Sequence, residues 1–197
     1  MIRKEDLELL YEQLDTLKDD DVLVLAGSIP SGMPQSIYRD IMSRLQSKRI
    51  KIAVDATKDL LMNVLAYHPF VIKPNNHELS EIFDIMIDSK EKAVVYAKEL
   101  QKKGAQNVIV SMAGEGAVFV GSDGSVFISE APHGVVKNSV GAGDSMVAGF
   151  LAGYLAKGDY AEAFKMGLCT GSASAFSDQL ATREEVEQVR RSHIFDF

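Results

Sequence analysis

Four short apolar runs alternate with helical patterns along the chain, and each run ends at a polar or glycine-containing turn. The runs are VLVLAG at 22–27, IKIAVDA at 50–56, PFVIKP at 69–74 and NVIVSM at 107–112. Continuous apolar runs of this length are typical of parallel strands that are buried on both faces. Strands that alternate with helices form a sheet with helices packed on both sides. We therefore expect an α/β fold with three layers, α/β/α, around a mainly parallel sheet, and a single domain over residues 1–197.

The segments between and after these runs carry the periodicity and the end signals of helices. Leucines recur on one face of the first segment, and Gly104 and Gly158 follow two others as stop signals. Two strands joined by a hairpin are expected on either side of a Ser-Asp-Gly turn at 122–124. The expected helices are 4–17, 37–45, 58–67, 76–85, 91–103 and 141–157, with capping-box pairs at Asp88 and Glu91, Asp159 and Glu162, and Thr182 and Glu185.

Charge and cysteine content limit the compartment and the kinds of partner. The 21 basic and 28 acidic residues give a formal charge of -7, which argues against a nucleic-acid surface. A small anionic ligand is still compatible, because backbone N–H groups can hold phosphate. Cys169 is the single cysteine, which suits a reducing cytoplasm and a buried filler role. We expect no membrane contact, because the start is charged and the apolar stretch 146–156 is too short to span a bilayer.

Polar turns follow the predicted strands, and ligands of such sheets bind beyond the carboxyl ends of the strands. The site is therefore expected among the turns at 27–28, 55, 73–75, 111–116 and 138–144.

The most informative of these segments is NSVGAGDSMVAGF at 138–150. Gly141, Ala142 and Gly143 precede an apolar helix, whose first N–H groups have no partner inside the helix and carry partial positive charge. The turn is thus a candidate anion site. Asp144 enters the first turn, where a carboxylate can accept the proton of an alcohol that attacks a phosphoryl group. The residues alone leave open that Asp144 merely caps the helix and that the glycines merely permit a turn.

The same segment resembles the C-terminal signature of the ribokinase-like sugar kinases, also called the phosphofructokinase B family. The resemblance implies a ribokinase-like, Rossmann-like fold and ATP as the phosphoryl donor. It implies that Asp144 is the catalytic base and contacts the sugar. It also implies that the backbone from Gly141 to Gly143 forms the anion hole, with Gly143 at the nucleotide as well. The shared residues are Asn138, Ser139, Gly141, Ala142, Gly143, Asp144, Ala148 and Gly149.

A second segment resembles the Asn-x-x-Glu motif of the family. Asn75 and Glu78 match it, and the resemblance implies that they hold Mg²⁺ through water, while Lys73 lies near the nucleotide phosphates. Mg²⁺ prefers oxygen ligands and keeps several waters, which suits such a site. The alternative is a helix that opens after Pro74 with Glu78 in its first turn.

A third segment, at 111–116, resembles the nucleotide loop Ser-x-Gly-x-x-Gly of the family. Ser111, Gly114 and Gly116 are present, whereas Ala113 stands where Gly is usual. This departure weakens any role that needs a positive φ at position 113. The resemblance implies that Ser111, Ala113, Gly114 and Gly116 bind the nucleotide. The alternative is a tight turn between strands.

Two further segments match less specific parts of the family pattern. GLCTGSASAF at 167–176 resembles the region that lines the adenine pocket, with Ser174 as a candidate contact. Close packing of small residues between helices is the alternative. Gly27 and Ser28 resemble a turn near the sugar phosphate, and a plain turn is the alternative.

The resemblance is strongest to family members that act on phosphosugars with a free primary hydroxyl. It implies phosphorylation of D-fructose 1-phosphate to D-fructose 1,6-bisphosphate with ATP and Mg²⁺. A tagatose 6-phosphate kinase or another sugar kinase of the family is the alternative, and a homodimer is compatible with it.

The resemblance covers the C-terminal majority of a family member. The N-terminal segment of the family, with its Gly-Gly sugar-binding motif and lid strands, has no counterpart in these 197 residues. A truncated, non-catalytic nucleotide-binding module is therefore an alternative of another class. A dinucleotide-dependent oxidoreductase would be a third class, but GEGAVFVG at 114–121 continues into a strand and not into a helix.

Overall fold

Six strands form one sheet in the order β1-β2-β3-β4-β5-β6 in the computed structural model, which describes residues 2–197. The first four strands are parallel to one another, and β5 and β6 form an antiparallel hairpin at one edge. The mainly parallel sheet and the predicted hairpin are thus confirmed. The strands are β1 (Val22–Ala26), β2 (Lys51–Asp55), β3 (Val71–Ile72), β4 (Asn107–Ser111), β5 (Ala117–Val120) and β6 (Val126–Ser129).

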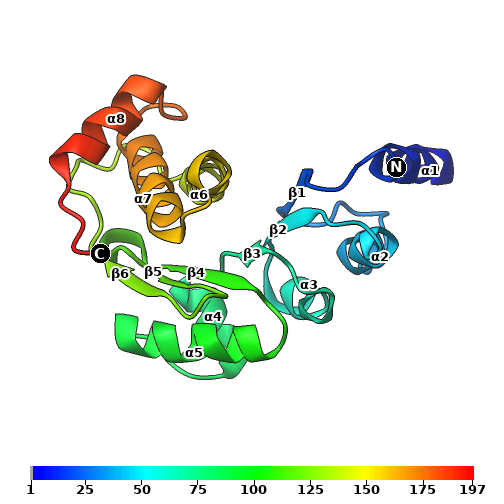
Figure 1. The fold of residues 1–197 in the computed structure, drawn as a ribbon. Helices are drawn as coiled ribbons and strands as arrows, with labels where there is room; N and C mark the ends of the chain where they lie inside the picture. The colour runs from blue at the N-terminus through cyan, green and yellow to red at the C-terminus, as the bar shows by residue number, and fades with distance from the viewer. Residues whose placement is uncertain (1) are drawn as a thin grey trace.

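The helices lie in two layers, one on each side of the sheet, so the three-layer prediction is confirmed. Figure 1 shows α6, α7 and α8 on one side of the strands and α3, α4 and α5 on the other. The helices are α1 (Lys4–Asp15), α2 (Ile37–Leu45), α3 (Lys58–Met62), α4 (Asn76–Phe83), α5 (Lys90–Lys102), α6 (Ala142–Lys157), α7 (Tyr160–Phe176) and α8 (Arg183–Ser192), with 3₁₀ turns η1 (Leu65–Tyr67) and η2 (Ala113–Glu115).

Alternate residues of each central strand enter opposite cores, as the period of two along a strand requires. Val108 and Val110 pack toward the side of α2 to α5, whereas Ile109 packs toward α6 and α7. The second core is aromatic, with Phe119 of β5 against Phe150 and Phe164. Fully burying a side chain of this size contributes about 1.5–3 kcal/mol.

β1 departs from the prediction that the strands are buried on both faces. It is the edge strand of the sheet, and within residues 2–197 no strand pairs with its outer edge. Val24 is 46% exposed, because α6 and α7 cover β2 to β5 and leave this face of β1 open.

Two local predictions were wrong at their ends. The helix expected at 58–67 is divided into α3 and η1, and His68 then takes a left-handed conformation that turns the chain into β3. The expected capping box of Asp88 and Glu91 does not form, because Ser89 is the N-cap of α5 and accepts a hydrogen bond from the amide of Lys92. The pair Thr182 and Glu185 does form a capping box.

Helices α6 and α7 form a tight antiparallel pair whose contact depends on glycine. A Cβ at Gly149 would lie 2.5 Å from Oγ1 of Thr170 and 2.7 Å from the carbonyl oxygen of Met166. A Cβ at Gly171 would lie 3.0 Å from the carbonyl oxygen of Ala142. The small residues therefore allow the backbones to approach closely, and this approach fixes the start of α6 against α7.

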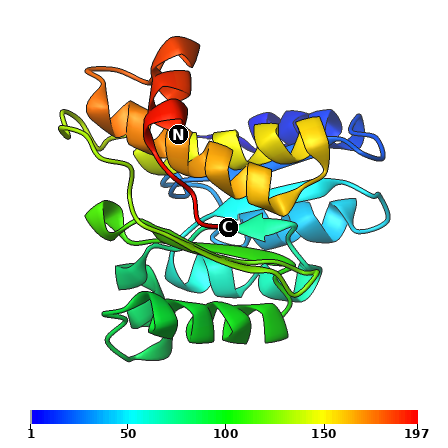
Figure 2. The ribbon, with the colours of Figure 1, turned by 60° about the vertical axis from the view of Figure 1, so that its left-hand side comes forward.

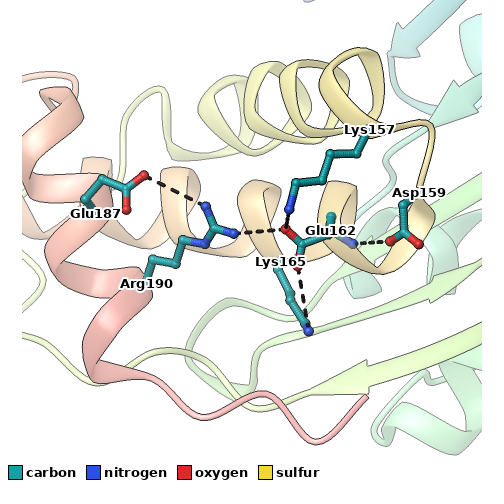
Figure 3. A network of polar contacts seen from close by, with 6 residues as sticks. All are labelled: Lys157, Asp159, Glu162, Lys165, Glu187 and Arg190. Carbon is teal, nitrogen blue, oxygen red and sulfur yellow. Dashed lines mark hydrogen bonds and ion pairs between the residues drawn. The ribbon is translucent and has the colours of Figure 1, made fainter.

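A charged network ties this pair to α8, as Figure 3 shows. The carboxylate of Glu162 pairs with Lys157 at 2.7 Å, with Arg190 at 2.9 Å and with Lys165 at 4.0 Å. Its backbone amide donates to Asp159, the N-cap of α7. The hydrogen bond from Lys157, and then the nearby positive charges, hold the pKa of Glu162 below its ordinary value.

We expect Glu162→Gln to lower the free energy of unfolding by about 1–2 kcal/mol at pH 7, because a network is worth more than one exposed pair. A carboxyl whose pKa is lowered by folding stabilises the folded state above its unfolded pKa and loses that effect as the pH falls through the folded value. The difference between the two proteins should therefore shrink below pH 4.5, the ordinary pKa of the group. Urea denaturation followed by circular dichroism at several pH values measures it.

Glu8→Gln is the matched control, because Glu8 pairs with Lys4 at 3.6 Å on an exposed helix face. Its expected change is below about 0.5 kcal/mol. Equal stability of Glu162→Gln and the unchanged protein at pH 7 would contradict the structural role of the network.

Candidate active site

A cleft of about 630 Å³ opens beyond the carboxyl end of β4. The turn at 111–116 lines one wall, with Ser111, Ala113, Gly114 and Gly116. The start of α6 lines another wall and contributes Ser139, Ala142 and Gly143. The fold thus brings together the two glycine-containing turns that the sequence analysis singled out at 111–116 and 138–144.

The start of α6 presents backbone amides with no protein acceptor. Gly141 is the N-cap, with a φ of 80°, and its carbonyl oxygen accepts the amide of Ser145. The amide of Ala142 already donates to the carbonyl oxygen of Ser139 at 3.2 Å. Within residues 2–197, the amides of Gly141, Gly143 and Asp144 have no such acceptor. Together with the dipole of a 16-residue helix, they make a site for an anion.

Asp144 lies in the first turn of α6 and is exposed to solvent. Its side chain therefore lies outside the packed interior, where it can take part in chemistry. Its negative charge reaches Asp55, where it is one of the causes that raise the pKa of that carboxyl.

A buried ion pair lies next to this turn. Nζ of Lys73 is 3.2 Å from Oδ2 of Asp55, and the two side chains are 7% and 18% exposed. Burial is the largest cause that raises the pKa of Asp55, and the ammonium of Lys73 opposes it. A Cβ at Gly143 would lie 3.2 Å from the same Nζ atom, so Lys73 sits directly against the anion turn.

The turn at 111–116 has a backbone that glycine favours at two positions. Ala113 adopts a φ of 48°, although the sequence analysis argued that alanine weakens a role requiring a positive φ there. Gly116 adopts a φ of 93° and its carbonyl oxygen accepts the amide of Met112 at 2.8 Å. Gly114 faces open space, with no atom within 4 Å of a built Cβ. The turn therefore leaves its backbone accessible from the cleft.

Asn75 and Glu78 form the capping box of α4. The amide of Glu78 donates to Oδ1 of Asn75 at 2.8 Å, and the amide of Asn75 donates to Oε2 of Glu78 at 2.9 Å. The cap uses one carboxylate oxygen and leaves Oε1 of Glu78 for water. The residues thus fit a cation that is held through water and by ligand phosphates, as Mg²⁺ usually is. Within residues 2–197, no group of three or more His, Cys, Asp or Glu residues could hold a metal ion directly.

Helix α7 contributes a stripe of residues to the cleft from the segment 167–176, which the sequence analysis compared with an adenine pocket while naming only Ser174 as a contact. Leu168, Gly171, Ser172, Ala175 and Phe176 line it, at the spacing of one helix face. Applying that period to 167–176 would have found them.

Ser174, the predicted nucleotide contact, lies off this stripe. It is 2% exposed, its hydroxyl donates to Oγ of Ser145 and it accepts the amide of Ala181. Its place is in the packing between α6 and α7.

The segment after β6 forms a further wall that the sequence analysis did not predict. It includes Glu130, Ala131, Pro132 and His133. Figure 2 shows this yellow-green segment rising from the sheet to α7, where the amide of Lys137 donates to the carbonyl oxygen of Ala175. No motif marks these residues, because only the three-dimensional path brings them to the cleft.

Gly27 and Ser28 lie beyond the end of β1, outside the lining of the cleft. Gly27 has a φ of 85°, and its amide donates to the carbonyl oxygen of Asp55 at 3.0 Å. They are thus adjacent to the Asp55 end of the ion pair.

Cys169 is fully buried, and burial raises the pKa of its thiol to about 12. It is therefore not a reactive thiolate. The sequence analysis expected this, because it gave Cys169 a buried filler role. None of the helices within residues 2–197 combines the length and the apolar character needed to cross a membrane.

Comparisons with known proteins relate the chain to carbohydrate kinases. Residues 2–185 match the family described as pfkB family carbohydrate kinase. A 1-phosphofructokinase of Bacillus subtilis is 44% identical over 188 residues, which are 95% of this chain and 62% of the relative. A D-tagatose-1-phosphate kinase of Bacillus licheniformis is 30% identical over 167 residues, covering 84% of this chain and 55% of the relative.

A crystal structure from Staphylococcus aureus, provisionally assigned as a phosphofructokinase, superimposes with a TM-score of 0.91 at 37% identity. The match covers 97% of this chain and 62% of the other. The chain thus spans about three fifths of the length of the relatives it matches.

Proposed function

The chain belongs to the pfkB family of carbohydrate kinases, and from this premise we propose that it carries the phosphoryl-transfer centre of an ATP-dependent phosphosugar kinase. The acceptor that we propose is D-fructose 1-phosphate, which would become D-fructose 1,6-bisphosphate. The observation that carries the proposal is the start of α6, where acceptor-free amides, the Lys73 ammonium and the exposed Asp144 lie together. The name of the 44% identical relative supports the acceptor.

The proposed transfer needs an anion cradle and a proton acceptor. The amides of Gly141, Gly143 and Asp144 hold the γ-phosphoryl group, whose negative charge spreads over its oxygens in the transition state. The C6 hydroxyl oxygen of the sugar bonds to phosphorus as the bond from phosphorus to the ADP oxygen breaks. The hydroxyl proton passes to the carboxylate of Asp144, and ADP leaves with the electron pair.

The nucleotide would lie in the cleft between the turn at 111–116 and the α7 stripe. Ser111, Ala113, Gly114 and Gly116 offer backbone groups to it, and Gly143 contacts its terminal phosphate. The apolar and small residues of α7 face the base, as is typical of nucleotide and cofactor sites. Gly27 and Ser28 would bind the sugar phosphate from the neighbouring strand end.

Asn75 and Glu78 would hold Mg²⁺ through water, next to the nucleotide phosphates. The ion would supply positive charge that screens the phosphate oxygens when it is bound. The capping box has its own role in this arrangement, because it fixes the two side chains against each other before any ligand arrives, and Asn75 lines the cleft.

This proposal has one alternative within the family and one of another class. A tagatose phosphate differs from the fructose phosphate in one hydroxyl configuration, and a relative named as a D-tagatose-1-phosphate kinase favours testing it. A non-catalytic nucleotide-binding module is the alternative of another class, favoured by the share of the relatives that the chain spans. The cytoplasmic location, the single domain and a homodimer stay predictions.

We expect ATP with Mg²⁺ to yield ADP when D-fructose 1-phosphate is present, with a higher kcat/KM than with D-tagatose 1-phosphate, D-tagatose 6-phosphate or D-fructose 6-phosphate. A coupled assay of ADP release measures this, and ATP without sugar is the control. A higher kcat/KM for a tagatose phosphate would contradict the proposed acceptor but support the proposed kinase activity. If the protein binds nucleotide but none of these sugars increases ADP release, the result would instead support the non-catalytic module.

A further inference from the structure

Asp55 and Lys73 are held level with each other by the sheet itself. The parallel register pairs Val54 with Ile72, so the next residues, Asp55 and Lys73, leave β2 and β3 side by side. Ala53 and Val71 lie two positions earlier and belong to the core beneath α6 and α7. Since side chains alternate along a strand, Asp55 and Lys73 share that face and point toward α6.

The ammonium of Lys73 lies between two partners. Its Nζ is 3.2 Å from Oδ2 of Asp55 and 3.2 Å from the position that a Cβ of Gly143 would occupy. One side of the ammonium thus meets a carboxylate, and the other side lies against the amide turn at the start of α6. A charge buried to this degree, at 7% exposure, needs a partner in place before any ligand arrives.

We propose that Asp55 is a positioning residue, whose carboxylate holds the Lys73 ammonium against the turn from Gly141 to Gly143 so that it meets the transferring phosphoryl group. This inference rests on the proposed function, because it assigns Asp55 a role toward the same anion. A lysine side chain has four rotatable bonds, and the carboxylate selects one arrangement of them in advance. Such preorganisation lowers the reorganisation needed at the moment of transfer.

Asp55 differs from Asp144 in the features that a base requires. Its carboxylate is engaged with Lys73 and largely buried, whereas Asp144 is exposed in the first turn of α6. The charged groups that face Asp55 are Lys73 and Asp144. Removing its negative charge therefore leaves Lys73 attractive to the phosphates of ATP but no longer fixed beside the reacting group.

The test compares Asp55→Asn, Asp55→Glu, Lys73→Met and the double variant Asp55→Asn with Lys73→Met. We expect Asp55→Asn to lower kcat at least about tenfold without raising KM for ATP, because only the transition-state contact loses its geometry. Asp55→Glu keeps the charge and should recover part of the loss. In the Lys73→Met background, Asp55→Asn should cause little further loss of kcat. Asp88→Asn, which removes an exposed partner of Lys92, is the matched control and should leave kcat and KM unchanged.

A second measurement follows the position of Lys73 without a substrate. In protein labelled with ¹³C and ¹⁵N at lysine, relaxation of the Lys73 Cε group should show greater motion in Asp55→Asn than in the unchanged protein. Equal motion of Lys73 in the two proteins would overturn the inference. So would an equal loss in kcat when Asp55→Asn is introduced into the Lys73→Met variant and into the unchanged protein. If the unchanged protein binds ATP but transfers nothing to a sugar, the proposed function fails, and the relaxation measurement alone decides the role of Asp55.

Discussion

Asp144→Asn is expected to lower sugar-dependent ADP release by about 10²- to 10⁴-fold, the usual contribution of a positioned general base. The amide of Asn keeps the size of the side chain but cannot accept the hydroxyl proton of the sugar. Because Asp144 is exposed and its side chain takes no part in helix packing, the fold and its melting temperature should be retained. The measurement is kcat in the coupled assay, with ATP affinity by calorimetry.

ATP should bind Asp144→Asn at least as tightly as it binds the unchanged protein. The substitution removes a negative charge next to the phosphate site and leaves the amides of α6 in place. Glu91→Gln is the matched control, because Glu91 is an exposed acidic residue in the first turn of another helix, α5. Activity of Asp144→Asn within about threefold of the unchanged protein would remove Asp144 from the mechanism, since a base contributes far more than that.

The order of helices and strands was predictable because each element carries its own periodicity and end signals. The position of β1 at the edge was not, because its five residues read as a buried strand while its exposure depends on which helices cover it. The left-handed turn at His68, which ends η1, was not predictable for a related reason, since it is set by the path into β3.

The candidate site divides in the same way. The amide turn before α6 and the turn at 111–116 were predictable, because glycine marks both of them in the sequence. The α7 stripe could have been found by helical spacing, and the place of Ser174 off that stripe follows from the same count. The pairing of Asp55 with Lys73 depends on β2 lying next to β3, which only the sheet order provides.

The two glycines of the 111–116 turn are expected to respond very differently to the same substitution. At Gly116, φ is 93° and ψ is -136°, a conformation that residues with a Cβ essentially do not adopt. A Cβ there would lie 2.1 Å from the carbonyl oxygen of Ser129 and 2.6 Å from the carbonyl carbon of Glu130. At Gly114 a Cβ would meet nothing within 4 Å.

Gly116→Ala should therefore lower the free energy of unfolding by about 3–5 kcal/mol, since backbone strain adds to a clash with main-chain atoms that cannot rotate away. That is a large part of the roughly 5–15 kcal/mol that stabilises a typical domain. Gly114→Ala should change it by less than about 0.5 kcal/mol. Urea denaturation of both variants, followed by circular dichroism, gives the comparison.

The same substitution should affect nucleotide binding, because a Cβ at Gly116 would meet atoms of Ser129, Glu130 and Ala131, and the last two residues line the cleft beside this turn. We expect Gly116→Ala to weaken ATP binding at least about tenfold under conditions where the variant is still folded, and Gly114→Ala to change it less. Equal stability and equal ATP affinity of the two variants would mean that the backbone of Gly116 does not hold the turn against the segment after β6. The cleft would then lack the rigid wall on which the proposed nucleotide site depends.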